Sequence, residues 1–364
     1  MIRIWLANGV LWLFLALSGF GQHAGLTMVP VPGGRFHMGD SHGVGWPDER
    51  PVHTVEIAPF LMDSCEISNA EMCRALQWAL EAGLVVAGAG SVSNAVGAGQ
   101  ASHQSMQHGA GQASHQSLQH GAGQELVDLD DWNCEIVFAD GRFATLPGRE
   151  KFPCIEVTWH GALAYANFRS GMEELETCVE FLDWSCDFAR NGYRLPTEAE
   201  WEFAARGGLV GQHFPWFGFG TNVAEALTGD RANYWGSGDA FETEANMQAT
   251  PVGYYNGAQQ PAGSNMANGY GLYDMAGNVY EWCWDFYDEV WYARTEAGAR
   301  DTTGPAMGYG RVVRGGSWLS GSREDARPGA AQGAAYYLRC ANRGVAEPGN
   351  GRHNRGFRCV RRLD

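Results

Sequence analysis

Short runs of alternating apolar and polar residues dominate the beginning of the chain. Residues 28–31 and 35–38 are two such runs, and the glycine pair between them is a turn signal. Residues 52–57 also alternate apolar and polar side chains, as expected for a strand with one buried face. We therefore expect short β-strands across residues 28–62.

Two capping boxes predict helices. Ser68 is followed three residues later by Glu71, which predicts a helix that runs to about Ala82, before a glycine. Thr197 and Glu200 repeat the pattern, and the glycine pair that follows should end that second helix. In both boxes the side chain of the first residue accepts a backbone N–H that the first helical turn leaves unpaired.

The remaining pattern indicates a third helix and several short strands. Residues 126–131 and 135–145 read together as a polar-edged hairpin, and residues 157–170 as a helix. Beyond the second capping box the chain is rich in Gly, Asn and aromatic residues, with short strands expected at 310–314 and 356–360. Few long strands and much irregular structure match no common fold by pattern alone.

Residues 87–124 form a low-complexity segment. Residues 97–108 read GAGQASHQSMQH and residues 109–120 read GAGQASHQSLQH, so the repeat is twelve residues long. The segment has little to bury, and we expect a disordered surface insertion. Its four histidines could chelate a soft metal, and a duplicated loop without any metal is the simpler alternative. They are His103, His108, His115 and His120.

Composition supports one large, irregular domain. The chain has 364 residues, of which 45% are hydrophobic and 18% charged, so it can form a sizeable core. It has 50 glycines, about twice the average usage, which favours loops over a helical bundle. Fourteen tryptophans predict a core pinned by large aromatic side chains. The net charge of −16 argues against a nucleic-acid partner, because phosphate binding needs a basic face.

The N-terminus and the cysteines bear on the cellular compartment of the protein. Residues 1–24 combine one early positive charge, a short apolar stretch and small residues, which is typical of a secretory signal peptide. We therefore expect export to the periplasm, the cell surface or the medium, with no membrane span in the mature chain. The alternative is a start codon assigned upstream of the true one at Met28. The nine cysteines include no C-x-x-C pair, and an odd number leaves at least one thiol unpaired.

One segment near the C-terminus carries candidate chemistry. Residues 268–282 place Asp274 and Glu281 seven positions apart, with Gly277 and Asn278 between them. A loop of this kind can wrap a hard cation with carboxylates and backbone carbonyls. A structural turn with two solvated acids is the alternative reading.

Five ordered motifs resemble the sulfatase-modifying-factor family, whose namesake is formylglycine-generating enzyme. They are Gly33–Gly39, Arg194–Glu202, Asn268–Trp282, Arg314–Trp318 and Gly356–Cys359. The resemblance covers residues 28–362. It implies an α+β fold, the irregular, loop-rich, C-type-lectin-like fold of formylglycine-generating enzyme. In that fold, loops and bound calcium substitute for regular structure.

The resemblance also implies calcium sites. The first maps onto Asp274, the backbone carbonyls of Gly277 and Val279, and Glu281. The second maps across a variable loop onto Asn233, the carbonyl of Tyr234, Glu244 and Asn246. Asp239 could replace Glu244 in that second set.

The catalytic residues of the family are replaced. Formylglycine-generating enzyme needs two cysteines that bind copper(I), a soft ion suited to thiolates. These positions are Ser320 and Ala335 here, so we expect neither copper nor the family's oxidase activity. Cys340 matches a structural cysteine of the family, and its usual partner position is Ala205. We expect Cys340 to be a buried free thiol or to pair elsewhere.

Two function classes remain open. The first is a non-catalytic ligand-binding or surface-display protein, because the variable proteins of diversity-generating retroelements share this fold and vary residues near its C-terminus. Aromatic and amide side chains near the C-terminus of this chain suit a protein or peptide ligand. They are Trp318, Ser320, Tyr336, Tyr337, Arg339, Asn342, Arg343, His353 and Asn354. Ordinary loop and core roles are the alternative for these residues. The second class is an oxidoreductase acting on protein cysteine.

Overall fold

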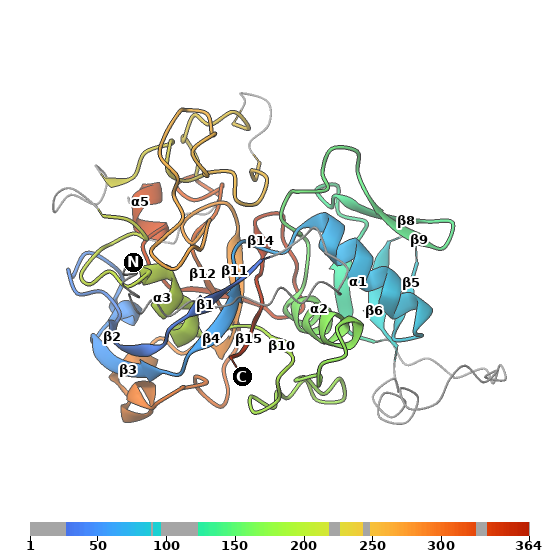
Figure 1. The fold of residues 1–364 in the computed structure, drawn as a ribbon, viewed down its shortest axis with the longest axis horizontal. Coiled ribbons are helices and arrows are strands. Elements are labelled where there is room, and N and C mark those ends of the chain that lie inside the picture. Colours follow the sequence, from blue (N-terminus) through green and yellow to red (C-terminus); the bar gives the residue numbers. More distant parts are fainter. Residues whose placement is uncertain are drawn as a thin grey trace, which may run out of the picture.

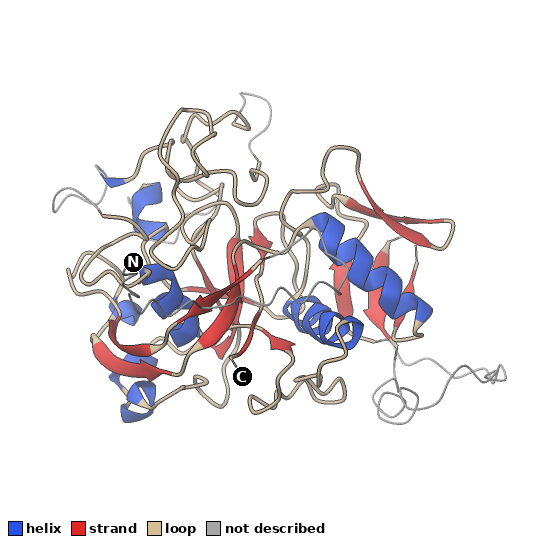
Figure 2. Cartoon of the chain, viewed as in Figure 1, coloured by secondary structure: helices blue, strands red, loops and turns tan. Residues whose placement is uncertain are grey.

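The structure is a computed structural model that mixes helices, short strands and long loops (Figures 1 and 2). It describes residues 27–88, 90–95, 123–217, 226–242, 248–324 and 333–363. The expected α+β class is confirmed. The sequence-predicted signal peptide, residues 1–24, lies outside the described residues.

The elements follow in chain order. The first half contains β1 (Met28–Val31), β2 (Gly34–Met38), η1 (Pro47–Glu49), β3 (His53–Ile57), β4 (Phe60–Asp63), α1 (Asn69–Glu81), β5 (Val85–Ala87), β6 (Ser91–Asn94), β7 (Glu125–Asp128), β8 (Ile136–Ala139), β9 (Arg142–Thr145) and α2 (Trp159–Met172). The second half contains β10 (Tyr193–Arg194), α3 (Glu198–Arg206), β11 (Tyr280–Phe286), η4 (Trp291–Ala293), η5 (Thr295–Gly298), β12 (Arg311–Arg314), α5 (Ala334–Tyr337), β13 (Gly344–Ala346), β14 (Arg355–Gly356) and β15 (Val360–Arg362).

Two four-stranded sheets occupy the centre of the molecule. One has the order β1-β4-β15-β10 and the other β13-β12-β11-β14. In Figure 1 the strands lie between α3 on one side and the α1–α2 pair on the other. The last strands, β14 and β15, return to β11 and β4, so the C-terminus closes both sheets. Segments far apart in sequence therefore meet around β11.

Both capping boxes form as predicted. The hydroxyl of Ser68 accepts the Glu71 N–H, and the Glu71 carboxylate accepts the Ser68 N–H at 3.0 Å. Thr197 and Glu200 exchange the same pair of bonds at the start of α3. That helix ends at Gly207, whose φ of 54° is the left-handed conformation that glycine adopts at low cost.

The core holds large aromatic residues and paired charges. Trp159, Trp201 and Trp282 are fully buried, as the tryptophan content predicts. Several arginines are equally buried, and each has a carboxylate partner, as buried charge requires. The pairs are Arg194–Glu200, Arg314–Glu202, Arg339–Glu49, Arg343–Glu198 and Arg358–Glu281.

Two expectations about strands need correction. The low-complexity segment was expected to be unstructured from residue 87, yet β6 lies inside it and pairs with β5 and β7. The strand at 125–128 joins that sheet, and the hairpin consists of β8 and β9 alone. Local composition did not predict β6, because pairing with neighbouring strands stabilises it more than its own sequence does. The two repeats, residues 97–120, lie outside the described residues.

Within the ranges that the structure describes, no helix is long and apolar enough to cross a membrane.

Candidate functional site

The turn after β12 builds the candidate site. Gly315 and Gly316 have φ values of 94° and 74°, and a Cβ at Gly316 would lie 2.7 Å from a methyl of Leu338. Only glycine fits both demands. In the turn that follows, the Ser317 N–H donates to Ser320 Oγ at 3.0 Å, and the Ser320 N–H donates to Ser317 O at 2.9 Å.

The family resemblance implies that Ser320 occupies the first of two copper-binding positions. Its side chain is fully buried, and its hydroxyl lies 3.4 Å from the Tyr280 hydroxyl at the start of β11. Ala335, to which the resemblance assigns the second position, is buried in α5. Neither a hydroxyl nor a methyl group is a soft ligand, so Ser320 and Ala335 do not fit copper(I).

The nine cysteines lie elsewhere, seven of them buried and two partly exposed. All nine are described and unpaired, and burial raises the pKa of every thiol above its ordinary value. Cys340 has a pKa of about 12 and is fully buried, which confirms the expectation of a buried free thiol. Thiols with such pKa values are protonated at neutral pH and are poor nucleophiles.

Three of the predicted ligand-binding side chains are partly exposed. Trp318, Tyr336 and His353 reach the surface, and the Trp318 indole N–H donates to the His353 carbonyl at 3.1 Å. The rings of Trp318 and His353 pack with centroids 5.6 Å apart. We refer to Ser317, Trp318, Ser320, His353 and Asn354 as the Ser320 site.

Two hydrogen-bond acceptors in and beside the Ser320 site are buried without a hydrogen-bond donor. Asn354 donates through Nδ2 to Ser317 Oγ at 3.4 Å, but its Oδ1 has no partner among the described residues. Glu156 Oε1 also lacks a hydrogen-bond donor among the described residues, and His353 Nδ1 lies 3.9 Å from this carboxylate oxygen. Buried polar atoms are normally paired, so each marks a place for water or for a ligand donor.

Glu156 is unusual in conformation and in charge. Its φ is 54°, which is rare for a residue other than glycine, and it is 3% exposed. Burial, with smaller contributions from Asp131 and Asp128, raises the pKa of its carboxyl to about 8. The other nitrogen of the His353 ring lies 3.7 Å from the exposed Glu324 carboxylate. Sequence reasoning missed Glu156, since only its contacts across the fold distinguish it.

Several other predicted ligand-binding residues belong to the core. Arg339 holds Glu49 with two bonds of 2.6 Å, and Arg343 holds Glu198 with bonds of 2.7 and 2.9 Å. Asn342 donates to Glu49 at 3.3 Å. Together with Tyr337, these side chains are at most 2% exposed. The two arginines and Asn342 are engaged by buried carboxylates, and we therefore assign this group structural roles.

The predicted first calcium set is rearranged in the structure. Both oxygens of Glu281 accept from the Arg358 guanidinium at 2.6 and 2.7 Å, and one also accepts from the Trp201 indole at 2.8 Å. Glu281 is thus neutralised and fully hydrogen-bonded by protein groups. Asp274 instead accepts the Gly253 N–H at 2.6 Å and adjoins Glu66.

Glu66 is the acid that sequence reasoning missed here. Its Oε1 accepts from Asn278 Nδ2 at 3.0 Å, and its Oε2 has no donor among the described residues. Desolvation raises the pKa of both Glu66 and Asp274, and repulsion from Asp274 raises that of Glu66 further. An orphaned oxygen beside a second carboxyl fits a hard cation, with backbone carbonyls completing the ligands. The described residues contain no group of three or more Asp, Glu, His or Cys side chains that could hold a metal.

The second predicted calcium set is only partly described. Glu244 and Asn246 lie outside the described residues. Asn233 is buried beside the first set, where its carbonyl accepts the Asn278 N–H at 3.0 Å. The carbonyl of Tyr234 accepts the Ser237 N–H, and both oxygens of Asp239 accept hydrogen bonds from residues 237–255.

The sulfatase-modifying factor enzyme 1-like domain matches residues 17–363, nearly the whole chain. The chain belongs to the sulfatase-modifying factor family. It is 31% identical over 344 residues to a formylglycine-generating enzyme of Streptomyces coelicolor, covering 92% of this chain and 89% of that enzyme. It is also 31% identical to an inactive Cα-formylglycine-generating enzyme 2 of Bos taurus, covering 96% and 91% of the two chains.

A solved structure supports the same fold. The variable protein 1 of Treponema denticola superposes with a TM-score of 0.55 at 25% identity, covering 93% of this chain and 95% of that one. The resemblance read from the five sequence motifs is confirmed, and so is the formylglycine-generating-enzyme type of fold. The family contains both proteins named as enzymes and a protein named as inactive.

Proposed function

We propose that this member of the sulfatase-modifying factor family is a non-catalytic protein that binds a protein or peptide ligand at the Ser320 site. One observation carries the proposal: Ser320, at a position where the resemblance implies a copper-binding thiolate, is a buried hydroxyl held by Ser317. Copper(I) prefers two soft sulfur ligands, and neither Ser320 nor Ala335 supplies one.

The surroundings of the Ser320 site support a donor-rich ligand. Glu156 Oε1 and Asn354 Oδ1 are buried acceptors without donors, and a peptide offers backbone N–H groups in a row. Trp318 and Tyr336 present partly exposed aromatic surface, which forms the anchors of many protein–protein interfaces. The same proposal includes export of the protein, cleavage of its signal peptide near residue 24 and display on the cell surface.

Calcium is proposed as a structural ion, held by Asp274, Glu66 and backbone carbonyls such as those of Gly277 and Val279. Three carboxyls surround a single guanidinium there, since Glu66, Asp274 and Glu281 all interact with Arg358. A divalent cation would offset the excess negative charge. Its role would be to fix the loop that precedes β11.

Catalysis is tested with a C-x-P-x-R peptide and supplied copper. We expect no conversion of the cysteine to an aldehyde, read as the characteristic mass loss of the peptide. The Streptomyces coelicolor enzyme is the positive control. Copper-dependent turnover by the wild-type chain would contradict the proposal, especially if Cys340→Ser abolished it.

Ligand binding is tested separately by selecting a displayed random-peptide library on the folded protein. Selected peptides should lose binding to Trp318→Ala, whose ring packs on His353, and to Tyr336→Ala, which removes another partly exposed ring of the predicted ligand set. Tyr309→Ala is the matched control, because Tyr309 is 75% exposed and packs on Tyr287, outside the Ser320 site. Peptides that bind all three variants equally would show that the Ser320 site is not used.

The second candidate is an oxidoreductase acting on protein cysteine. The 31% identity to an enzyme of that name over most of the chain favours it. The peptide assay above decides between the two candidates.

A further inference from the structure

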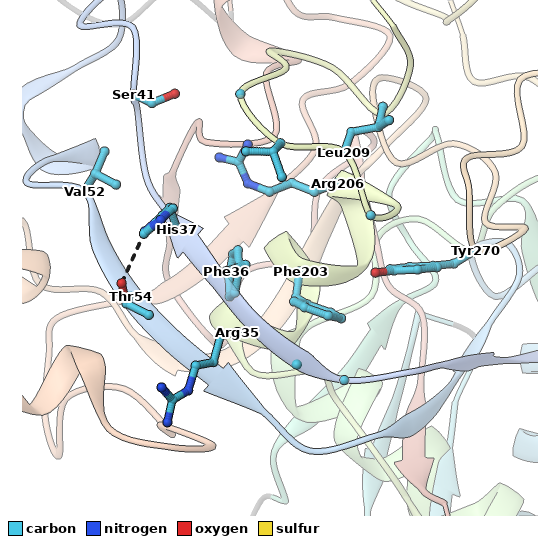
Figure 3. Close-up of a pocket in the computed structure, with 15 residues that line it drawn as sticks. Arg35, Phe36, His37, Ser41, Val52, Thr54, Phe203, Arg206, Leu209 and Tyr270 are labelled. Carbon is cyan, nitrogen blue, oxygen red and sulfur yellow. Dashed lines mark hydrogen bonds between the residues drawn. The ribbon is translucent and has the colours of Figure 1, made fainter.

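A large pocket lies along β2, away from the Ser320 site. Its volume is about 720 Å³, within the range of about 300–1,000 Å³ that is usual for ligand sites. The consecutive residues 33–37 line one wall and residues 208–211 line another. Figure 3 shows β2 between β3, which carries Thr54, and the segment that carries Leu209. No residue of the Ser320 site lines this pocket.

The pocket runs beside an unpaired strand edge. Among the described residues β2 pairs only with β3, so the opposite edge of β2 has no strand partner. Alternate N–H and C=O groups of an edge strand point away from its neighbour and can template another chain. No backbone hydrogen bond joins residues 34–38 to residues 208–211 in the described structure.

Aromatic rings form the floor of the pocket. Phe36 meets Phe203 edge to face with centroids 5.3 Å apart, and Phe203 stacks on Tyr270 at 5.9 Å. In Figure 3 the Tyr270 hydroxyl points toward Phe203 and the interior of the pocket. Gly208 and Gly211, with φ values of 83° and 67°, add no side chain to the opposite wall, which Leu209 and Val210 also line.

The strand on the paired edge of β2 shows which pattern this ribbon accepts. In β3, Val55 and Ile57 are buried, while Thr54 and Glu56 face outward. Glu56 pairs with Arg35 of β2 at 2.8 Å. A strand added to this ribbon should therefore place apolar residues on the core face and polar residues on the outer face. One of the polar residues should be an acid opposite Arg35.

The charge of the pocket suits the same pattern. The chain has 41 acidic and 25 basic residues, yet none of the fifteen residues that line the pocket is Asp or Glu. Arg35 has a side chain that is 76% exposed, and His37 lies two positions away on the same face of β2. An acidic ligand is favoured here, although the molecule as a whole would repel it.

We propose that the outer edge of β2 binds an extended peptide segment of alternating apolar and acidic residues as an added strand. Its apolar side chains would lie on Phe36, Phe203 and Tyr270, and its acids beside Arg35 and His37. The site is distinct from the ligand surface of the proposed function and does not depend on it.

The test uses a labelled, end-capped peptide with the sequence of residues 53–58, His-Thr-Val-Glu-Ile-Ala, titrated by fluorescence anisotropy. Two further peptides are N-methylated, one at Thr and Glu and the other at Val and Ile. Only alternate N–H groups of an added strand face its partner, so one methylated peptide should lose binding and the other should keep it. Equal behaviour of the two would overturn strand addition. Competition by 4-phenylbutyrate with both peptides still binding would assign the pocket to a small amphiphilic acid instead.

Matched variants locate the binding. Val210→Trp should fill the pocket and abolish binding, because Val210 lines it and is 84% exposed. Val137→Trp, at an exposed valine of β8 outside the pocket, should bind normally. Arg35→Glu should weaken binding about fivefold, and a peptide with Lys in place of Glu should recover it. Unchanged binding to Val210→Trp would overturn the proposal.

Discussion

At the scale of the residue, Glu156 combines two costs in one position. It holds a left-handed backbone conformation that asparagine and glycine adopt more readily, and it buries a carboxyl without a hydrogen bond to one oxygen. Both costs fall beside His353, where the proposed ligand would bind. Strained and unsatisfied groups of this kind cluster at functional sites.

This position makes a prediction about pH. The pKa of Glu156 is about 8 in the folded protein, above its ordinary value, so folding favours the protonated form. Its destabilising effect is absent below about pH 4.5, grows as the pH rises and is complete above about pH 8. Replacing Glu156 with Asn removes the ionisable group and suits the backbone, so the variant should be more stable than the wild type by about 2 kcal/mol at pH 8.

Chemical unfolding at pH 5 and pH 8 measures this difference. The gain should shrink by more than half at the lower pH, where the wild-type carboxyl is largely protonated. Glu289→Asn, at an exposed glutamate, is the control and should change stability little at either pH. A gain that is equal at both pH values would assign the effect to the backbone alone.

Single residues could be placed from the sequence only where a motif fixed their position. Ser320 and Ala335 could be located because the motifs around them position the turn and the short helix. Arg339 and Arg343 were placed in the right segment, yet their burial follows from Glu49 and Glu198, which lie about 290 and 145 positions earlier in the chain. Partners at such distances leave no trace in local pattern.

At the scale of the element, local signals predicted the helices and missed the strands that depend on partners. A capping box satisfies its own first turn, so Ser68 and Thr197 could be recognised alone. By contrast the first three residues of β11, Tyr280–Trp282, were read as part of a cation-binding loop, because the strand's partners β12 and β14 come later in the chain. Strand formation depends on those partners more than on propensity.

The capping box of α1 makes a quantitative prediction. Ser68→Ala leaves the Glu71 N–H without its acceptor and the Glu71 carboxylate without the Ser68 hydroxyl, which donates at 2.7 Å. The free energy of unfolding should fall by about 1 kcal/mol. Ser68→Thr keeps the hydroxyl and should lose much less. Urea unfolding of the three proteins measures the difference, and equal losses for both variants would show that packing, not capping, matters at this position.

The repeats make a prediction about β6 and β7. Asn94 and Gln124 lie next to each other, since the Gln124 N–H donates to Asn94 Oδ1 at 2.7 Å. Deleting residues 97–120 should therefore leave a short loop between two paired strands, and the melting temperature should stay within a few degrees of the wild type.

Deleting residues 88–123 provides the contrast, because it also removes β6 and should destabilise the fold by several kcal/mol. Circular dichroism melting of both deletions distinguishes them. Unfolding of the shorter deletion would show that the repeats carry structure.

At the scale of the whole molecule, buried ion pairs hold irregular segments around β11. Glu281 of β11 pairs with Arg358 near the C-terminus, and Glu202 of α3 pairs with Arg314 at the end of β12. Four of the five family motifs contribute these residues, which explains why they are scattered in sequence and close in space. Recognition of the motifs therefore predicted the fold, while the carboxyls outside any motif, Glu66 and Glu156, could not be predicted.

The balance of buried charge leads to the last prediction, which concerns calcium. If calcium binds only the folded protein, a concentration a hundredfold above its dissociation constant stabilises the fold by about 2.7 kcal/mol. Adding a chelator should therefore lower the melting temperature of the wild type. Glu66→Gln and Asp274→Asn should each remove this difference. Glu66→Gln should also raise the melting temperature in chelator, because it relieves the repulsion between two carboxyls.

Glu281→Gln is the control that separates a calcium ligand from an ion-pair partner. Both Glu281 oxygens accept hydrogen bonds from Arg358. The substitution should therefore lower the melting temperature by the same amount with and without calcium. Loss of the calcium-dependent difference in Glu281→Gln alone would restore the ligand set read from the sequence. If neither calcium nor chelator changed the melting temperature of the wild type, no metal would bind at the loop before β11. The Glu66–Asp274 pair would then share a proton.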